Sequence, residues 1–225
     1  MRTLSDAAYR TDHHLFGFSG DRMKLYYSPG ACSLSPHIAL HESGLPFEAI
    51  AAPTKTHKLA DGTDFYTINP LGYVPFLVLD DGRTLHEGPA IVQYIADQAP
   101  AAQLAPPNGS WERYKLQEWL NLISTELHKG GFSPLFAPGM PDAAKEMAKT
   151  RLNGRLAWVD GELAGRDYLL GSQFSVADAY LFVVAGWGKF VGVDIAGLSN
   201  LSAFMARVVA RPKVQAALKA EGLLK

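Results

Sequence analysis

The 225-residue sequence has an ordinary globular composition, with 48% hydrophobic residues, 19% charged residues and a formal net charge of -1. Because acidic and basic residues are scattered along the chain, small molecules or proteins are expected as partners rather than nucleic acid or an anionic membrane. The one cysteine, Cys32, cannot form an internal disulfide, and no segment has the length of a transmembrane helix or the apolar core of a signal peptide. A cytoplasmic location is therefore expected, where the thiol stays reduced.

The N-terminal half predicts alternating strands and helices. The run KLYY (24–27) predicts a strand, LSPHIALHES (34–43) predicts a helix that ends at Gly44, and FEAIA (47–51) predicts a second strand parallel to the first. A short, weakly patterned helix is predicted around residues 56–66.

A β-hairpin and one more helix complete this half. In VPFLVLDDGRTLHEG, the pair Asp81-Gly82 lies between two apolar segments and is expected to supply the positive φ angles of a tight turn. A helix is predicted through PAIVQYIAD. Residues 100–110 are rich in Pro and Ala, lack a periodic pattern and predict a linker.

The remaining residues, 111–225, predict helices throughout. Apolar side chains recur at helical spacing in residues 111–128, and Gly130-Gly131 is expected to interrupt that helix. A further helix is predicted over residues 142–164.

The run FSVADAYLFVVAGW predicts the central helix of this second half. It opens with Ser175 as N-cap and Asp178 at the third helical position, which is a capping box. Because the run is apolar on nearly every side, the helix is expected to be buried. Ser175 is therefore a folding signal and not a catalyst.

Five stretches, in order along the chain, resemble the cytosolic glutathione S-transferases and the bacterial beta class in particular. They are YYSPGACSLSPHIAL, NPLGYVPFLVLDDG, LHEGPAIVQYIAD, EWLNLISTELHKG and FSVADAYLF. The resemblance implies an α+β fold, with a thioredoxin-like glutathione-binding domain over residues 23–99 and an all-helical domain with the electrophile site over residues 111–225. It also implies glutathione as co-substrate, a small hydrophobic electrophile and a homodimer. Residues 1–22 precede the usual start of the family and are expected to contribute little.

Cys32 is the strongest candidate for catalysis. It follows the turn PGA and precedes Ser33, an expected N-cap, so its sulfur is expected near free N–H groups that lower a thiol pKa from about 8.5. On the sequence alone, a buried structural cysteine fits equally well. The resemblance implies a catalytic thiol that faces the glutathione sulfur and forms a mixed disulfide with it.

Two hydroxyl groups compete with Cys32 for the role of stabilising the glutathione thiolate. Tyr27 and Ser33 are residue types that other classes of the family use for this purpose, which makes both candidate glutathione-binding residues. The simpler interpretation is a strand residue for Tyr27 and a helix cap for Ser33. Both rank below Cys32.

The bond between Val74 and Pro75 opens a strand. Composition alone predicts a trans bond, because only about 5–6% of X-Pro bonds are cis. The resemblance implies a cis bond that exposes the Val74 backbone to the cysteinyl backbone of glutathione.

Glu87 and Gly88 precede Pro89 at the start of a helix. Proline suits this first turn, and the free N–H groups around Gly88 favour an anion such as the γ-glutamyl carboxylate of glutathione. Glu87 is expected to hold the γ-glutamyl ammonium. A solvated acidic residue that favours the helix dipole explains Glu87 as well. Many family members have serine in place of Gly88.

Asn121, His128 and Lys129 form the last group near the predicted glutathione site. Asn121 and His128 are seven residues apart, two helical turns, and so share a face. Pattern alone predicts ordinary basic residues at a helix C-terminus. The resemblance implies that His128 takes part in catalysis, that Lys129 faces glutathione, and that Asn121 reaches the ligand across a dimer interface. The run HKGG has one glycine more than the family pattern, which leaves the aim of Lys129 open.

Aromatic residues of the helical domain, Tyr114 and Trp187, are expected to hold the electrophile. Lys55, His57 and Lys58 are candidates for binding the glycine carboxylate of glutathione, and a solvated charged segment explains them equally well.

Metal binding is not expected. His37 and His41 are spaced i, i+4, but no HExxH signature or cysteine cluster accompanies them.

These residues predict a glutathione transferase that conjugates glutathione to small hydrophobic electrophiles, with thiol–disulfide exchange through a mixed disulfide of Cys32. Two alternatives stay open. One is a glutathione-dependent dehalogenase or disulfide reductase, and the other is a non-enzymatic binding or regulatory protein of the same fold. The electrophile itself is not readable from the sequence.

Overall fold

The computed structural model describes residues 22–224, so the predicted extension lies outside the described residues apart from Arg22. Four strands and two helices form the first domain. The elements are β1 (Met23–Tyr27), α1 (Leu34–Ser43), β2 (Phe47–Ala51), the 3-10 helix η1 (Phe65–Thr67), β3 (Phe76–Val78), β4 (Thr84–Leu85) and α2 (Gly88–Gln98). The strand order is β2-β1-β3-β4, with β1 and β2 parallel and β3 antiparallel to both of its neighbours. The α+β fold expected from the sequence is confirmed.

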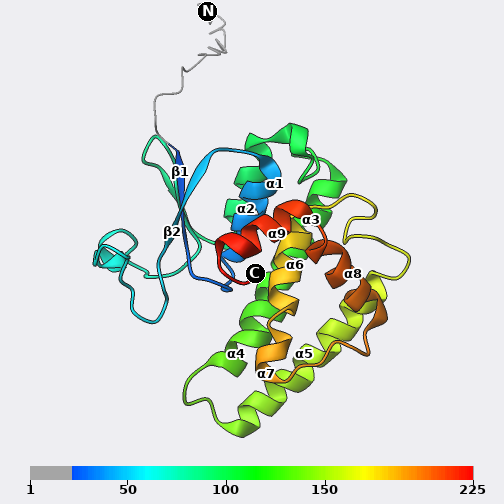
Figure 1. The fold of residues 1–225 in the computed structure, drawn as a ribbon. Helices are drawn as coiled ribbons and strands as arrows, with labels where there is room; N and C mark the ends of the chain where they lie inside the picture. The colour runs from blue at the N-terminus through cyan, green and yellow to red at the C-terminus, as the bar shows by residue number, and fades with distance from the viewer. Residues whose placement is uncertain (1–21, 225) are drawn as a thin grey trace, which may run out of the picture.

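Helices form all of the second domain after a short connection. The elements are η2 (Pro100–Ala102), α3 (Trp111–Leu122), the π-helix η3 (Ile123–Phe132), α4 (Ser133–Phe136), α5 (Asp142–Glu162), α6 (Val176–Ala185), α7 (Gly188–Val191), α8 (Ser199–Val209) and α9 (Pro212–Ala220). Figure 1 shows α1 and α2 between the sheet and these helices, with α9 lying across α1. One hydrophobic core therefore extends through both domains.

Helix α6 lies at the centre of the second domain, as predicted. All ten of its residues are buried. The capping box is present, because Asp178 accepts hydrogen bonds from the Ser175 backbone N–H and hydroxyl at 2.8 and 2.7 Å. The second carboxylate oxygen accepts from the backbone N–H of Leu169 at 2.8 Å, and burial raises the pKa of Asp178 to about 6. The start of α6 is thereby tied to the preceding loop.

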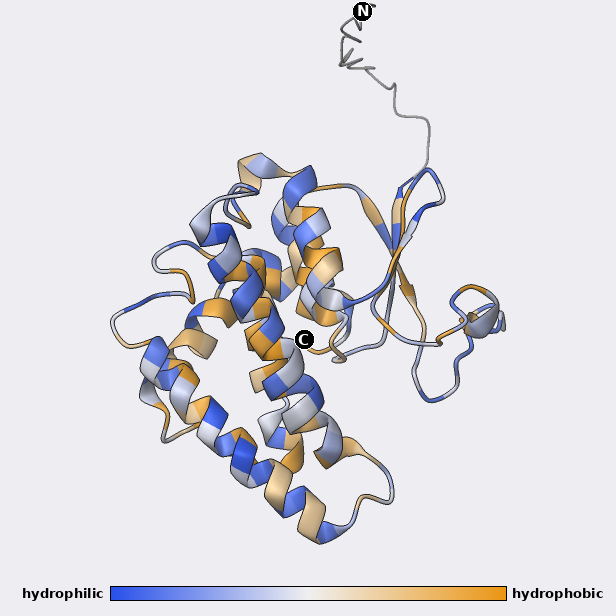
Figure 2. Ribbon diagram, turned by 180° about the vertical axis from the view of Figure 1, so that it is seen from behind, coloured by the Kyte–Doolittle hydropathy of each residue, from blue (hydrophilic) through white to orange (hydrophobic). Residues whose placement is uncertain are grey.

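Helix α5 covers the outside of the second domain and buries only one stripe. Ala148, Leu152, Leu156 and Val159 are its buried residues, at spacings of three and four. Figure 2 shows the corresponding alternation of hydrophobic and hydrophilic residues along this long helix. The pattern is that of an amphipathic surface helix.

The predicted helix over residues 56–66 is wrong. His57 and Gly62 have positive φ angles of 52° and 87°, which end any right-handed helix, and only the three-residue η1 follows. The side chains of Asp61 and Asp64 accept hydrogen bonds from backbone N–H groups two residues further on. These local turns compete with helix formation, as short acidic side chains commonly do.

The predicted hairpin is present, but its turn differs from the prediction. Only Gly82 has a positive φ, 83°. Asp81 instead uses its carboxylate to accept a hydrogen bond from the Arg83 backbone N–H at 3.0 Å.

Gly130 and Gly131 do not interrupt the helix. They lie in η3, whose wider turns accommodate one more residue than an α-helix. A Cβ atom on Gly130 would lie 2.6 Å from the Thr125 carbonyl oxygen, and one on Gly131 would lie 2.8 Å from Leu152 of α5. Position 130 therefore requires glycine because the obstacle is backbone, whereas a side chain at Gly131 would have to displace the end of the Leu152 side chain.

Within residues 22–224, no helix combines the length and the apolar character that crossing a bilayer requires.

We expect Gly130→Ala to destabilise the fold by about 1–3 kcal/mol, because the added methyl group meets backbone rather than a movable side chain. Gly154→Ala is the matched control, since Gly154 lies in α5 with open space around it, and this change should be neutral or stabilising by up to about 1 kcal/mol. Urea unfolding of both variants measures the difference. Equal stability of the two would show that the π-helix does not need Gly130.

Candidate active site

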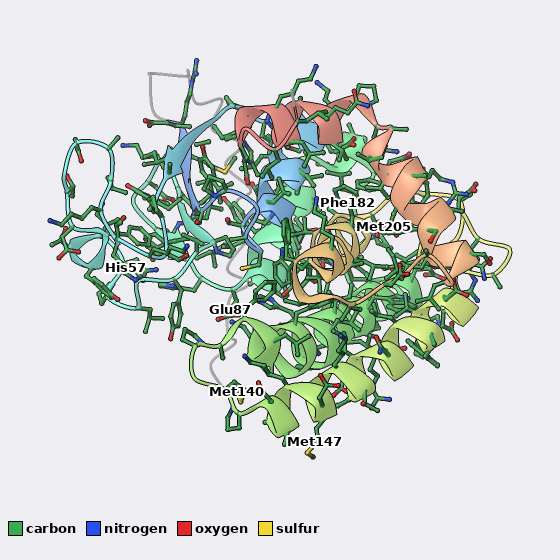
Figure 3. All side chains as sticks on the ribbon, turned by 60° about the horizontal axis from the view of Figure 1, so that its bottom comes forward. His57, Glu87, Met140, Met147, Phe182 and Met205 are labelled. Atoms are coloured by element: carbon green, nitrogen blue, oxygen red, sulfur yellow. The ribbon has the colours of Figure 1, made fainter. Side chains whose placement is uncertain are left out.

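A narrow cleft of about 40 Å³ lies where Cys32, just before α1, and the start of α2 face η3 and α6. Figure 3 shows Glu87 at this boundary between the two domains. The predicted site residues Cys32, Val74, Pro75, Glu87, Gly88, His128 and Lys129 all line the cleft. Leu71, Tyr73, His86, Ser124 and Tyr180 also line it and were not predicted from the sequence.

Cys32 contacts the loop that carries the predicted cis bond. The Val74–Pro75 bond is cis, which confirms what the resemblance implied. The Cys32 thiol donates a hydrogen bond to the Val74 carbonyl oxygen at 3.3 Å. This contact fixes the sulfur beside the backbone that was predicted to bind glutathione.

The predicted lowering of the Cys32 pKa is wrong. Burial raises the pKa of the thiol to about 11, and the Lys129 ammonium and the backbone N–H groups of Cys32 and Ser33 offset this only in part. The N–H groups of the helix start are present as expected, but desolvation of the thiolate outweighs them. Cys32 is therefore a neutral thiol near pH 7.

A hydrogen bond to a tyrosine fixes the position of His128. Its Nδ1 lies 2.7 Å from the Tyr180 hydroxyl, and burial, aided by the Lys129 charge, lowers the pKa of His128 to about 4. The imidazole is neutral near pH 7, and the hydrogen bond fixes the orientation of its ring. The signal for Tyr180 in the sequence is a hydroxyl within an apolar helix, because a buried tyrosine needs a polar partner.

Glu87 has an unusual backbone conformation at the start of α2. Its φ of 65° is in the left-handed region, which costs a non-glycine residue about 1 kcal/mol or more. Its side chain is exposed and caps no backbone N–H of α2. The carboxylate therefore stays available at the cleft, directly before the first N–H groups of the helix.

Three other candidates lie outside the cleft. Ser33 is fully buried, and its hydroxyl accepts from Ser28 N–H at 3.0 Å and donates to Ser28 O at 3.2 Å, so it closes a loop instead of capping α1. Tyr27 packs against His37 with ring centroids 5.2 Å apart. Tyr114 is 57% exposed on α3.

Asn121 does not share a face with His128. Asn121 is exposed on α3, whereas His128 is buried in η3. The predicted alignment assumed 3.6 residues per turn, but the helix widens after Leu122, so seven residues fall short of two full turns. The π-helix also places the consecutive residues His128 and Lys129 together in the cleft.

A second hollow of about 620 Å³ adjoins the cleft through His128. Trp187 lines it, as expected for the electrophile, together with Phe136, Phe190 and Lys55. The other basic candidates do not line it. Figure 3 shows His57 at the outer edge of the first domain, well apart from Glu87.

The loop before Cys32 is fixed from the second domain. The Gly30 backbone N–H donates to a Glu221 carboxylate oxygen at 2.9 Å, and the Gly30 carbonyl accepts from Trp187 Nε1 at 2.9 Å. The other Glu221 oxygen lies 2.8 Å from His37 Nδ1. His37 thus has a structural partner, and among residues 22–224 no group of three or more His, Cys, Asp or Glu side chains is arranged to hold a metal.

Family comparisons agree with this geometry. The family model for the glutathione S-transferase N-terminal domain matches residues 30–98, and the one for the C-terminal domain matches residues 125–212. The chain belongs to the glutathione S-transferase family. This glutathione transferase is 48% identical over 201 residues to glutathione S-transferase GstA of Escherichia coli O157:H7. The match covers 89% of this chain and 100% of GstA.

Solved structures support the same conclusion. The transferase is similar to BphK, a bacterial glutathione S-transferase solved as a ternary complex, with 60% identity, a TM-score of 0.86 and coverage of 89% of this chain and 100% of BphK. It is also similar to a beta-class glutathione S-transferase from Sphingomonas chungbukensis, with 52% identity, a TM-score of 0.85 and coverage of 89% and 100%. The expected class of enzyme and its bacterial beta-class resemblance are confirmed.

We expect the rate of Cys32 alkylation by iodoacetamide to follow the thiolate fraction, so it should still rise through about pH 9. Lys129→Met removes a charge that favours the thiolate and should lower the rate at that pH. Lys24→Met, at an exposed position of β1, is the matched control and should leave it unchanged. Because Cys32 is the one cysteine, total incorporation reports this site alone. A plateau below about pH 8.5 would contradict control by burial.

Proposed function

We propose that this glutathione transferase conjugates the glutathione thiol to small hydrophobic electrophiles in the cleft at the domain boundary. The observation that carries the proposal is the convergence of the Val74 backbone, the start of α2 at Glu87 and Gly88, and the Cys32 thiol on one cleft. An apolar hollow large enough for a small organic substrate adjoins it.

The peptide part of glutathione fits the first-domain side of the cleft. The Val74 backbone would pair with the cysteinyl backbone, and the Glu87 carboxylate would accept hydrogen bonds from the γ-glutamyl ammonium. The N–H groups at the start of α2 would bind the γ-glutamyl carboxylate, because a helix N-terminus attracts anions. In this arrangement the glutathione sulfur lies beside Cys32.

Both sides of the cleft supply groups that stabilise a thiolate. From the second domain, the Lys129 ammonium offers a positive charge and the neutral His128 ring can donate a hydrogen bond to a glutathione sulfur. From the first domain, the neutral Cys32 thiol would donate a hydrogen bond to that sulfur in place of its bond to the Val74 carbonyl. Preorganised donors of this kind favour the charged nucleophile without reorganisation during the reaction. The thiolate then attacks the electrophile: a carbon–sulfur bond forms, the leaving group departs with its electron pair, and the thiol proton passes to solvent.

Thiol–disulfide exchange is a second candidate activity, favoured by the position of Cys32 within the cleft. The Cys32 thiolate would attack a glutathione mixed disulfide, forming a bond to the glutathionyl sulfur and releasing the other thiolate, which takes up a proton. A second glutathione thiolate would then attack that sulfur, releasing oxidised glutathione and restoring Cys32. Since the raised pKa leaves little thiolate at pH 7, this reaction should accelerate as the pH rises.

Turnover of an aryl halide and of a glutathione mixed disulfide, measured side by side, separates the candidate functions. Formation of the glutathione thioether with release of halide supports the transferase. Reduction of the mixed disulfide without thioether formation supports the degradative alternative. Absence of turnover of both substrates supports a binding protein.

A homodimer through α3 completes the proposal. Trp111 and Tyr114 on this helix are 72% and 57% exposed, which is unusual for large hydrophobic side chains and favours an interface. Asn121, on the same helix, would then reach the partner's glutathione. A cytoplasmic location follows from an enzyme that needs its one thiol reduced.

We expect Glu87→Gln to weaken glutathione binding by about 1.5–3 kcal/mol, through loss of a hydrogen bond between charged groups. Glu112→Gln is the matched control, because Glu112 also lies in the first turn of a helix but outside the cleft. Calorimetric titration with glutathione compares the two. An equal effect of both changes would reduce Glu87 to a helix-dipole residue.

We expect oxidised glutathione to convert the wild type to one adduct, detected by mass spectrometry and removed by a reductant, at a rate that increases with pH. Cys32→Ala should form no adduct and should lose disulfide-reductase activity. It should keep most of its glutathione affinity and part of its aryl-halide conjugation, because the nucleophile in conjugation is the glutathione sulfur. An adduct in the variant would locate the exchange reaction elsewhere.

A further inference from the structure

Tyr180 carries a hydroxyl group that the packing of α6 does not require. Asp178 and Tyr180 are the two polar residues of this buried helix, and the capping box already uses Asp178. Phenylalanine in place of Tyr180 would fill nearly the same space without a polar group that needs a partner. The hydroxyl lies 2.7 Å from His128 Nδ1, and both residues line the cleft. The hydroxyl therefore concerns the site and not the folding of α6.

The ring of His128 is held on two sides and open at one nitrogen. Tyr180 and Trp187 contact it edge-on, with ring centroids 6.1 and 4.9 Å away. Within residues 22–224 Nε2 has no hydrogen-bond partner, yet it is not one of the buried side-chain atoms there that lack one. Nε2 is therefore accessible from the cleft or the adjoining hollow, both of which His128 lines.

Tyr180 and Ser124 together determine which nitrogen of His128 carries the proton. A neutral imidazole has one N–H group, and the hydrogen bond at one nitrogen sets the state of the other. Burial raises the pKa of Tyr180, so its hydroxyl stays protonated, and a hydrogen bond from the Ser124 side chain opposes this rise in part. A hydrogen bond that lowers the pKa of a phenol is donated to its oxygen. Since the oxygen accepts from Ser124, the Tyr180 proton is directed to Nδ1, which leaves the ring proton on Nε2.

The two tautomers of His128 would act on a glutathione thiolate in opposite ways. With the proton on Nε2, the accessible nitrogen is a donor and stabilises an anionic sulfur. With the proton on Nδ1, the same nitrogen presents a lone pair and repels the anion. Because the ring is already fixed in place, the position of this proton decides whether His128 helps or hinders ionisation of the thiol.

We propose that Tyr180 is a positioning residue that keeps His128 in the Nε2–H tautomer, so that the ring donates a hydrogen bond to the glutathione sulfur as the thiolate forms. This inference rests on the proposed function and adds the residue that sets the direction of the His128 hydrogen bond. Tyr180 acts through His128 and does not itself bind the sulfur.

The tautomer is measured by long-range 15N–1H correlation spectra of the full-length, ligand-free protein at neutral pH. In the wild type, His128 Nε2 should have the chemical shift of a protonated ring nitrogen and Nδ1 that of an unprotonated one, and spectra of His128→Gln identify the signals. Tyr180→Phe should move both shifts toward the average of the two tautomers. Ser124→Ala should do the same to a smaller extent, because it frees the Tyr180 oxygen to accept from Nδ1.

Tyr168→Phe is the matched control for the loss of a buried hydroxyl. Tyr168 is 8% exposed, and its hydroxyl accepts from Arg211 Nη1 at 3.3 Å, outside the cleft. This change should leave the His128 shifts and the kinetics unchanged.

Aryl-halide conjugation by the same variants tests the effect on the thiolate. Tyr180→Phe should lower kcat about tenfold and change KM for glutathione less than about twofold, because the donor acts on the developing charge and not on the peptide. The apparent pKa of the bound glutathione thiol, followed by thiolate absorbance, should rise by about one pH unit, which is the same tenfold effect. In the His128→Gln background, Tyr180→Phe should have no further effect.

Thermal unfolding confirms that each variant is folded, and Ser124→Ala provides the test should Tyr180→Phe fail to fold. A wild type with the proton on Nδ1, His128 shifts that neither variant changes, or an equal loss of activity from Tyr180→Phe with and without His128 would each overturn the proposal. Absence of conjugation by the wild type would contradict the proposed function instead, because the spectra report the tautomer without turnover.

Discussion

The carboxylate of Glu221 holds the loop that precedes Cys32. Its side chain is completely buried, and burying a charge of this kind costs several kcal/mol unless both oxygens find partners. One oxygen accepts from the Gly30 N–H at 2.9 Å, and the other lies 2.8 Å from His37 on α1. Gly30 precedes Glu221 by 191 residues, so the position of Cys32 depends on the complete chain being folded. Removing one partner would leave the others buried without compensation.

Trp187 forms a second hydrogen bond that holds the same loop. Its Nε1 bonds to Gly30 O, while its ring lies edge-on against His128 with centroids 4.9 Å apart. One side chain thus positions the loop before Cys32, contacts the neutral imidazole and lines the apolar hollow that adjoins the cleft. Because these roles need residues from both domains, the first domain alone would present an incomplete site.

Local sequence patterns predicted the structural features that depend on residues close together in the sequence. The bounds of α1 and β2 and the capping box at Ser175 follow from periodicity, stop signals and side-chain chemistry, and all agree with the structure. The cis bond before Pro75 was accessible only through the family resemblance. The hydrogen bond between Gly30 and Glu221 and the one between His128 and Tyr180 join distant segments of the chain. Spacing along the sequence does not encode such contacts. Burial of Cys32 has the same origin, which is why its pKa was predicted in the wrong direction.

The reactivity of Cys32 depends on two opposing effects, which are its burial and the positive charge of Lys129. A widened helix places that charge at the cleft. Desolvation favours the thiol, and the Lys129 ammonium opposes it. Lys129 lines the cleft together with His128 because η3 is wider than an α-helix, so consecutive side chains diverge less around its axis. That width in turn depends on Gly130, where a Cβ atom would collide with the Thr125 carbonyl. The additional glycine is thus linked through the helix geometry to the charge that acts on the thiol, and a change there would alter stability and thiol reactivity together.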